Sequence, residues 1–188
     1  ENNKVEIHKK RVNIVSITED ITMSVINFAK RQKIDVVFDA EQEELYCDID
    51  IDQMERIMLN ILSNAIKYNK PNGNIDVIVK DRKEKVYIDV IDRGIGIPKD
   101  RINTIFDRFE RMENKNAVIK EGSGIGLSIV KKLVDALDGE INIESEVDKG
   151  TTVRLIFKKS KNQNGIEEVY DISQHLEEKV NLEMSDIS

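Results

Sequence analysis

The sequence predicts a two-layer α/β sandwich, in which a mixed sheet packs against helices. Segments with the apolar patterns of β-strands occur along most of the chain, and three amphipathic helical patterns lie between them. The length of 188 residues leaves room for one domain of ordinary size and a tail. Charged residues make up 35% and hydrophobic residues 39% of the chain, a composition typical of a soluble globular domain.

The first part of the domain is predicted to contain three strands and a helix. Residues 12–15 are expected to form a short strand, and residues 34–38 and 45–49 two more. After the first strand, Ser16 or Thr18 is expected to cap a helix. The apolar side of this helix consists of Ile17, Ile21, Val25, Phe28 and Ala29.

The second helix has the most regular apolar pattern in the chain. Asp52 is expected to cap it, and it should stop near Tyr68, before the loop-forming residues 69–73. Its apolar positions follow the three-then-four spacing of a helix that buries one side: Met54, Ile57, Met58, Ile61, Leu62 and Ala65.

The middle of the chain combines the clearest strands with the longest irregular segment. Residues 75–79 and 86–91 are predicted to pair through a charged turn. From Gly94 to about Gly122 the apolar periodicity weakens. A loop of this length inside a compact domain is usually a functional lid or a disordered segment.

A third helix and two further strands complete a predicted sheet of about five strands. The helix is expected to end at Gly139, and the strands cover residues 141–144 and 151–157. The apolar positions of the helix are Ile129, Val130, Leu133, Val134 and Leu137.

The chain is predicted to contain one folded domain between two polar ends. We place a linker at residues 1–11, the domain at 12–158 and a tail at 159–188. The tail has one weak amphipathic pattern, which is expected to form a short helix or, more simply, a frayed end. The residues of this pattern are Ile172, Leu176 and Val180.

Charge, cysteine content and hydropathy exclude several classes of protein. A net charge of −7 disfavours nucleic acid as a partner, because phosphate backbones select basic surfaces. Cys47 is the only cysteine, so we expect neither a disulfide framework nor a cysteine-rich metal site. No segment approaches the roughly 18 apolar residues that cross a bilayer. We therefore expect a cytoplasmic domain, with any membrane anchor of the full-length protein outside this sequence.

A polar strip lies beside the apolar side of the second predicted helix. At about 100° per residue, Asn60, Asn64 and Lys67 fall on the same strip. Amide oxygens can bind Mg²⁺, and a lysine can bind phosphate. An ordinary solvated flank would have the same residue types, so the strip alone does not establish a binding site.

A second candidate site lies at residues 92–98, where a buried strand ends. The carboxylate of Asp92 can accept a hydrogen bond from an exocyclic amine such as that of adenine. Gly94 and Gly96 would let the backbone come close to a ligand. An Asp-initiated turn that leaves a strand would have the same sequence.

The glycine-rich residues 122–127 form a third candidate site at the start of the last helix. Backbone N–H groups at a helix N-terminus can bind phosphates. The glycine spacing matches neither a dinucleotide-binding fingerprint nor a P-loop, and a flexible hinge is the alternative. A fourth candidate is the hydroxyl of Thr152, although a plain hairpin turn is the simpler explanation of residues 150–152.

Four segments resemble the N, G1, F and G2 boxes of sensor histidine kinases, in the order and spacing of that family. They are Asn-Ile-Leu-Ser-Asn-Ala-Ile-Lys-Tyr (60–68), Asp-Arg-Gly-Ile-Gly-Ile-Pro (92–98), Ile-Phe-Asp-Arg-Phe-Glu-Arg (105–111) and Gly-Ser-Gly-Ile-Gly-Leu-Ser-Ile-Val (122–130). The resemblance covers about residues 12–157. Four boxes in the right order make a specific match.

The resemblance implies the ATP-binding sandwich shared with gyrase, heat-shock chaperones and mismatch-repair ATPases. In this fold the mixed, mostly antiparallel sheet has its helices on one face and a long ATP lid. The resemblance implies that Asn64 binds Mg²⁺, that Asn60 lies near the metal and that Lys67 contacts phosphate. Tyr68 would line the nucleotide site, and Asp92 would bind the adenine amine. The further ATP-binding positions are Gly94, Gly96, Ile97, Gly122, Ser123, Gly124, Ile125, Gly126, Leu127 and Thr152.

The F box supplies the last residues that the resemblance implies. Arg111 matches a lid arginine that can reach the γ-phosphate of ATP, and it completes a catalytic set with the three polar residues of the second helix. Phe106 and Phe109 are expected to anchor the lid or to dock on partner helices.

Sensor histidine kinases transfer the γ-phosphoryl of Mg-ATP to a histidine in a dimeric helical hairpin. Neither His8 nor His175 has the acidic neighbour and proline context of the family's acceptor box. The resemblance therefore implies an acceptor outside this sequence. It also implies two partners, the helical hairpin of the same kinase and a downstream response regulator. The full-length kinase is expected to be a membrane-anchored homodimer.

Three other functions are compatible with parts of the pattern. An ATPase of the same superfamily would commonly have a glutamate as general base where Asn60 stands, and an amide cannot take a proton. Neither Glu55 nor Glu110 is placed to replace it. A serine kinase of the anti-sigma type is disfavoured by the F box. A degenerate nucleotide-binding module is disfavoured because every box retains its polar residues.

Overall fold

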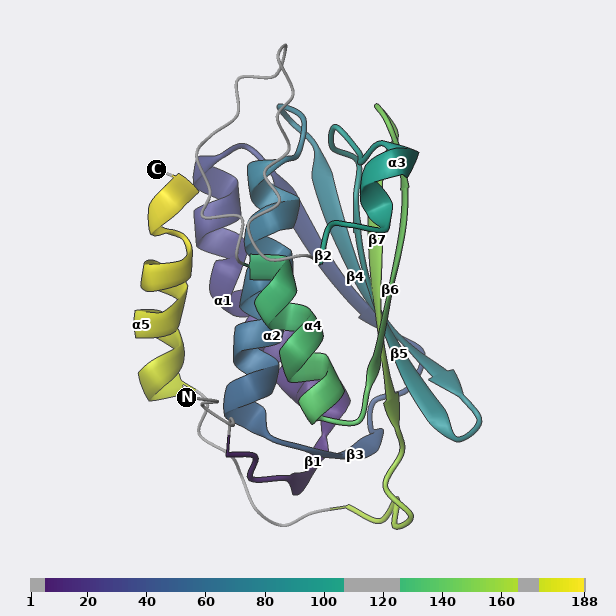
Figure 1. The fold of residues 1–188 in the computed structure, drawn as a ribbon. Helices are drawn as coiled ribbons and strands as arrows, with labels where there is room; N and C mark the ends of the chain where they lie inside the picture. The colour runs from purple at the N-terminus through teal and green to yellow at the C-terminus, as the bar shows by residue number, and fades with distance from the viewer. Residues whose placement is uncertain (1–5, 107–125, 166–172, 188) are drawn as a thin grey trace.

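A computed structural model describes residues 6–106, 126–165 and 173–187. The main sheet has five strands in the order β2-β4-β5-β7-β6, and helices α1, α2 and α4 lie against one face of it (Figure 1). The β2–β4 pair is parallel and the other pairs are antiparallel, so the predicted fold class is confirmed. The elements are α1 (Ile14–Arg31), β2 (Asp35–Ala40), α2 (Ile51–Lys67), β4 (Asn74–Arg82), β5 (Lys85–Asp92), α3 (Lys99–Ile102), α4 (Gly126–Ala136), β6 (Glu140–Glu146) and β7 (Gly150–Lys158).

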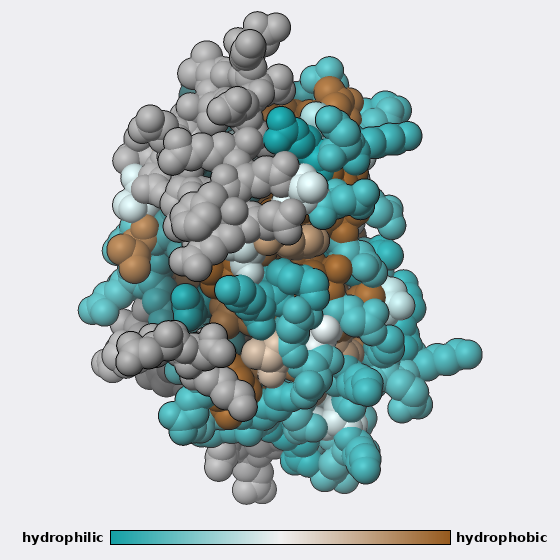
Figure 2. Space-filling model, in the orientation of Figure 1, coloured by the Kyte–Doolittle hydropathy of each residue, from teal (hydrophilic) through white to brown (hydrophobic). Residues whose placement is uncertain are grey.

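The hydrophobic core lies between the sheet and the helices, because buried and less buried side chains alternate along the strands. In β4 and β5, every second side chain is buried against the helical layer, and the residues between them form the other face of the sheet. The buried residues of these two strands include Ile75, Val77, Val79, Val86, Ile88 and Val90. Among the described residues, the face seen in Figure 2 is mainly hydrophilic, with hydrophobic side chains in scattered patches.

Helix α1 begins earlier than the sequence predicted. Asn13 is its N-cap, and the Oδ1 atom of Asn13 accepts hydrogen bonds from the backbone N–H groups of Val15 (3.1 Å) and Leu45 (3.2 Å). The predicted caps Ser16 and Thr18 are wrong, because both residues lie inside the helix. The predicted strand at residues 12–15 is also displaced: β1 (Lys10–Asn13) ends at the cap and pairs with β3 (Tyr46–Ile49) in a separate two-stranded sheet.

Helix α2 also begins before its predicted cap. Asp50 is the N-cap, and its Oδ1 atom accepts a hydrogen bond from the backbone N–H of Gln53 at 3.2 Å. The predicted cap Asp52 instead lies in the first turn, where its negative charge interacts favourably with the positive end of the helix dipole. The Oδ2 atom of Asp50 accepts the backbone N–H of His8 at 2.8 Å. The N-terminal segment is therefore attached to the start of α2.

The C-terminal tail contains the helix that its pattern predicted, but this helix is not frayed. Helix α5 (Ser173–Glu183) is followed by a 3-10 turn (Ser185–Ile187), and it packs beside α1 and α2 (Figure 1). Its buried residues, together with those of the turn, are Leu176, Val180, Met184 and Ile187. The expected frayed end is therefore wrong, because these apolar side chains have a surface to pack on. None of the described helices is long and apolar enough to cross a membrane.

An ion-pair network lies on the face of the sheet that α1, α2 and α4 do not cover. The two Asp89 carboxylate oxygens accept hydrogen bonds from Arg154 at 2.6 and 2.8 Å, and one also accepts Lys80 at 2.8 Å. The Asp89 side chain is only 1% exposed. Burial acts to raise its pKa, but the hydrogen bonds from Arg154 and Lys80 outweigh burial and lower the pKa of Asp89.

Replacing Asp89 with alanine should lower the free energy of unfolding by about 2 kcal/mol. The cost should fall below the ~3–5 kcal/mol of a fully buried pair, because Lys80 and Arg154 are partly exposed. Urea denaturation at pH 7 measures it. The stabilisation is present above the pKa of an unfolded aspartate, about 4, and is lost as the pH falls further. As a control, Asp135→Ala removes an exposed partner of Lys131 and should cost less than about 0.5 kcal/mol. Equal losses in the two variants would contradict the assignment.

Candidate functional site

The polar strip of α2 is present as predicted. Asn60, Asn64 and Lys67 lie one turn apart along the helix, and all three are half-buried. The neighbouring positions of α2 that face the core are fully buried, among them Ile57, Ile61 and Leu62. The strip is therefore the edge of α2 where polar side chains remain accessible.

The start of α4 lies against this strip. The described part of α4 begins at Gly126, and a Cβ atom at Gly126 would lie 2.7 Å from the Oδ1 atom of Asn60. The Nδ2 atom of Asn60 donates a hydrogen bond to the carbonyl oxygen of Arg56 at 2.9 Å, which leaves Oδ1 on the α4 side. The first N–H groups of a helix and its dipole favour anions. An acceptor oxygen and a helix N-terminus thus meet at this point.

The C-terminal end of α2 is joined to the segment after β5. The carbonyl oxygen of Tyr68 accepts the backbone N–H of Ile95 at 3.0 Å. A Cβ atom at Gly94 would lie 2.1 Å from the same oxygen, so a glycine is needed for this approach. The Nζ atom of Lys67 lies 5.7 Å from the centre of the Tyr68 ring, and burial raises the pKa of Tyr68. The strip and the predicted adenine-binding segment are therefore adjacent.

Asp92 is the last residue of β5 and is half-buried. Its Oδ1 atom accepts the backbone N–H of Gly94 at 2.8 Å, and the backbone of Thr151 also donates to it. Burial is the larger effect and raises the pKa of Asp92 to about 6, against these two hydrogen bonds. Asp92 is therefore a half-buried carboxylate that is held by backbone N–H groups.

The β6–β7 hairpin closes this end of the sheet. Gly96 has a φ of +69°, and a Cβ atom there would lie 2.0 Å from the carbonyl oxygen of Glu146. Ile97 donates its backbone N–H to the Oγ atom of Ser145 at 2.7 Å, and Asp148 donates its backbone N–H to the carbonyl oxygen of Ile95 at 2.8 Å. The segment after β5 is thus fixed between α2 and the hairpin.

Thr151, which the sequence analysis did not select, lies on the same face as Asp92. The register pairs Asp92 with Thr151 and Ile91 with Thr152. Because side chains alternate along a strand, the side chain of Thr152 lies on the opposite face of the sheet from that of Asp92. The alternation of apolar residues in the rest of β7 was the signal that could have identified Thr151.

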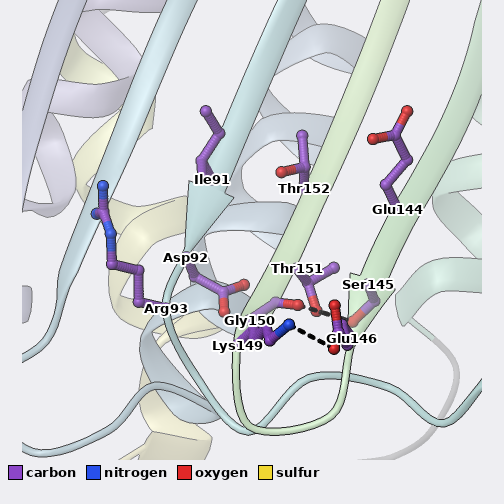
Figure 3. Close-up of a pocket in the computed structure, with 10 residues that line it drawn as sticks. All are labelled: Ile91, Asp92, Arg93, Glu144, Ser145, Glu146, Lys149, Gly150, Thr151 and Thr152. Carbon is purple, nitrogen blue, oxygen red and sulfur yellow. Dashed lines mark hydrogen bonds and ion pairs between the residues drawn. The ribbon is translucent and has the colours of Figure 1, made fainter.

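A pocket of about 380 Å³ opens beside these strand ends (Figure 3). It is lined by the end of β5, the end of β6 and the start of β7, and both Asp92 and Thr152 border it. Ser145 links the strands, because its Oγ atom donates to the carbonyl oxygen of Gly150 at 2.9 Å and lies 2.7 Å from the Oγ1 atom of Thr151. Like the position of Thr151, this link through Ser145 was not indicated by the sequence.

Several predicted site residues lie outside the described residues. They are Phe109, Arg111, Gly122, Ser123, Gly124 and Ile125. Arg108 and Glu110, which are not predicted site residues, also lie outside the described residues. Phe106, in the described part of the F box, is half-buried and packs against the core. Leu127, in the first turn of α4, is also half-buried.

A family model described as histidine kinase-, DNA gyrase B-, and HSP90-like ATPase matches residues 49–161 of this chain. The chain belongs to this family. The matched region contains every described candidate residue, from the α2 strip to Thr152. The family that the four sequence boxes resemble is therefore confirmed.

Proteins similar to this chain are sensor kinases. The signal transduction histidine-protein kinase ArlS of Staphylococcus haemolyticus is 35% identical over 157 residues, which are 82% of this chain and 34% of ArlS. The sensor histidine kinase WalK of Bacillus subtilis is 37% identical over 126 residues, which are 66% of this chain and 21% of WalK. The chain thus spans about a third or less of the length of these relatives.

The fold is also that of solved kinase domains. The catalytic domain of histidine kinase ThkA, in a nucleotide-free form, has a TM-score of 0.71 at 24% identity, and the match covers 81% of this chain and 99% of that domain. ThkA has also been solved in complex with the response regulator protein TrrA, with a TM-score of 0.71 at 22% identity, over 84% of this chain and 44% of that one. At these identities the likeness concerns the fold.

The residues present fit a nucleotide that brings its own metal ion. In the described part of the chain, no group of three or more histidine, cysteine, aspartate or glutamate residues is placed to hold a metal. Mg²⁺ bound with phosphates, however, needs only one or two protein oxygens. The amide oxygens of Asn60 and Asn64 could supply them, and Lys67 and the start of α4 could bind phosphates.

Replacing Gly96 with alanine should disrupt this end of the sandwich. The substitution puts a Cβ atom into the carbonyl oxygen of Glu146 at a left-handed φ, and we expect a loss of at least about 2 kcal/mol in the free energy of unfolding. Gly165→Ala is the matched control, because its Cβ atom would lie 3.5 Å from the hydroxyl of Tyr46 and should cost less than about 0.5 kcal/mol. Urea denaturation of both variants is the measurement, and an unchanged Gly96→Ala would show that the close approach is dispensable.

Proposed function

We propose that this chain is the ATP-binding catalytic domain of a sensor histidine kinase. It would transfer the γ-phosphoryl of Mg-ATP to a histidine in a dimerisation domain outside this sequence. One observation carries the proposal: in a chain whose relatives are sensor kinases, direct contacts bring the α2 strip, the start of α4 and the segment after β5 to the same end of the sandwich.

Each described site residue has a separate role in this proposal. Asp92 accepts a hydrogen bond from the exocyclic amine of adenine, and the glycines after it let the base approach the backbone. Lys67 and the N-terminus of α4 hold the phosphates, while Asn60 and Asn64 present amide oxygens to the metal. Mg²⁺ neutralises the charge of the phosphates when it is bound. The protein thereby aligns the γ-phosphoryl for in-line attack by a histidine nitrogen.

The surroundings of Asn60 favour transfer to a histidine over hydrolysis by water. Hydrolysis would need a general base near the metal, and the amide of Asn60 cannot take a proton. Glu55, the nearest glutamate before it on α2, forms an ion pair with Lys179 of α5 and is only 4% exposed. Its side chain is therefore directed to α5 rather than to the strip. A neutral histidine needs no such base because its nitrogen is already nucleophilic.

The proposed partners follow from the proposed reaction. The acceptor would be a helical hairpin of the same kinase, and the phosphoryl group would then pass to a response regulator. His8 is an exposed surface residue beside Glu6, without the context of an acceptor. We propose that the full-length kinase is a membrane-anchored homodimer and that this domain lies on the cytoplasmic side. Nucleic acid is not a proposed partner, since the net charge is −7.

Phosphotransfer to a supplied acceptor hairpin tests the reaction class. With γ-labelled Mg-ATP, the label should appear on the hairpin histidine only when this chain is present. Consumption of ATP at the same rate without the hairpin would instead identify a hydrolysing ATPase. Label on a serine would identify a serine kinase.

Calorimetric titration of ATP, with and without Mg²⁺, tests the site residues. Asp92→Asn removes a charge-assisted hydrogen bond worth about 1.5–3 kcal/mol, so the Kd should rise by roughly 10- to 100-fold. Asn64→Ala should remove the part of the affinity that depends on Mg²⁺. Asp48→Asn on β3 and Asn27→Ala on α1, both at exposed positions, are the matched controls and should bind as wild type does. Normal Mg-ATP affinity in both site variants would reject the assignment.

The raised pKa of Asp92 predicts a pH-dependent affinity. The ionised carboxylate is the form that accepts from the amine, so the affinity of the wild type should fall as the pH is lowered through about 6. The titration of the phosphates is common to the wild type and to Asp92→Asn, so the ratio of their Kd values isolates this group. A ratio that stays constant between pH 5 and 8 would contradict the prediction.

The effect of Asp92 on folding stability has the opposite pH dependence. Because its pKa is raised in the folded state, ionisation of Asp92 lowers the free energy of unfolding as the pH rises from about 4 to 6.

A further inference from the structure

The C-terminal segment 173–187 is a docked part of the domain, although it lies beyond the region that the family model matches. That model ends at residue 161. Helix α5 packs against both α1 and α2 and, in Figure 1, runs alongside α1. The Nε2 atom of Gln32, the C-cap residue of α1, donates a hydrogen bond to the carbonyl oxygen of Ile187 at 3.4 Å. We call residues 173–187 the clasp.

The clasp holds α2 through an ion-pair cluster as well as through apolar contacts. The Nζ atom of Lys179 forms ion pairs with Glu55 and, at 2.8 Å, with Asp52. Glu55 is 4% exposed, whereas Lys179 is 30% and Asp52 76% exposed. Burial acts to lower the pKa of Lys179, but the hydrogen bonds from Lys179 to Asp52 and Glu55 outweigh burial and raise its pKa. A carboxylate this well shielded depends on a cation beside it.

The ion-pair cluster of the clasp and the polar strip are on the same helix, α2, but on different sides of that helix. Glu55 and Asn60 are five residues apart, which places them about 140° apart around the helix. Leu59 lies one turn after Glu55 on the side of the clasp and is 2% exposed. A helix transmits a displacement of one side to the other, because its backbone hydrogen bonds make it rigid over a few turns.

Both ends of the described chain meet near the first turns of α2. The backbone N–H of His8 is bonded to the cap residue Asp50, and Lys179 is bonded to Asp52 and Glu55. The opposite end of α2 is fixed by the Tyr68–Ile95 hydrogen bond. The strip lies between these two attachments.

We propose that the clasp fixes the position of α2 and that Lys179, acting through Glu55, is a positioning residue for the nucleotide site. This inference rests on the proposed function, since it assumes that Asn60, Asn64 and Lys67 bind Mg-ATP. Coupling between two sites is reciprocal. Docking of the clasp therefore strengthens nucleotide binding, and nucleotide binding strengthens docking of the clasp, although the clasp touches no nucleotide.

Charge reversal at the ion pair tests the proposal. Lys179→Glu places a third carboxylate beside Asp52 and Glu55, and the Kd for Mg-ATP should rise about tenfold. Adding Glu55→Lys restores a pair of opposite charges and should restore most of the affinity. Lys85→Glu is the matched control, because it reverses one charge of the exposed ion pair between Lys85 and Glu140. This variant should bind Mg-ATP as the wild type does. An unchanged Kd in folded Lys179→Glu, or no rescue by the double variant, would overturn the role of Lys179.

Hydrogen exchange of the wild-type chain distinguishes a clasp that is coupled to the nucleotide site from one that only covers α1 and α2. Saturating Mg-ATP should slow amide exchange in residues 173–187, and equal exchange with and without nucleotide would overturn the coupling. If the wild type binds no Mg-ATP at all, the proposed function fails instead. The clasp is then tested by the exchange of α2 amides, which Lys179→Glu should accelerate and which would stay unchanged if the clasp does not hold α2.

Discussion

Helix α2 is buried around most of its circumference, and this burial determines where the site lies. The side facing the sheet contributes Met54, Ile57, Met58 and Ile61, each at most 2% exposed, and burial of such side chains stabilises a fold by roughly 1.5–3 kcal/mol each. A large rotation of the helix would therefore expose core residues to water, and only small adjustments of its position remain for other contacts to control. Since the side facing α5 is also covered, the strip from Asn60 to Lys67 is left as the accessible edge. The candidate binding residues are on this edge, and the rest of the helix is used for packing.

Backbone contacts at glycines then bring the other segments to that edge. Gly94 contacts the carbonyl oxygen of Tyr68, Gly96 that of Glu146, and Gly150 that of Asp92. At each point a Cβ atom would lie about 2 Å from a backbone oxygen, and a backbone oxygen cannot move aside as a flexible side chain can. The glycines of the G1 box therefore have a structural role in addition to any contact with a ligand. They permit α2, β5 and the β6–β7 hairpin to meet closely enough for their polar groups to act together.

Periodic features of the sequence predicted more than local ones did. The apolar spacing of α2 and the alternation of β4 and β5 depend on burial of many residues, so they identified both the elements and their faces. The caps of α1 and α2 were misplaced by a few residues, because Asn13 and Asp50 compete with Ser16 and Asp52 as equally suitable acceptors. The position of a cap is decided by where the preceding strand ends. That end is set by pairing with distant residues.

The same distinction applies to the candidate site and to the tail. The strip of α2 and the carboxylate of Asp92 could be predicted because each belongs to a periodic element. Thr152 borders the pocket, as does Thr151, whose side chain shares the face of Asp92. A turn at residues 150–152 does not indicate which threonine faces Asp92, whereas the alternation of the strand that follows does. Docking of α5 could not be predicted from its own weak pattern, since the surface that it covers is formed by α1 and α2. Its burial is a property of the assembled fold.

Two aspartates on β5 show how the strand separates a structural carboxylate from the one that we propose to bind a ligand. Asp89 and Asp92 are three residues apart and therefore lie on opposite faces of the sheet. Burial acts to raise the pKa of both, but Arg154 and Lys80 reverse the effect at Asp89, whereas backbone N–H groups offset it only in part at Asp92. The charge of Asp89 is neutralised within the fold, so this residue has little to gain from a ligand. Asp92 carries a carboxylate whose ionised form is still disfavoured, and a donor from a bound molecule would relieve that cost. The raised pKa of Asp92 is therefore a reason to propose ligand recognition at this end of β5, and this reason is independent of any sequence resemblance.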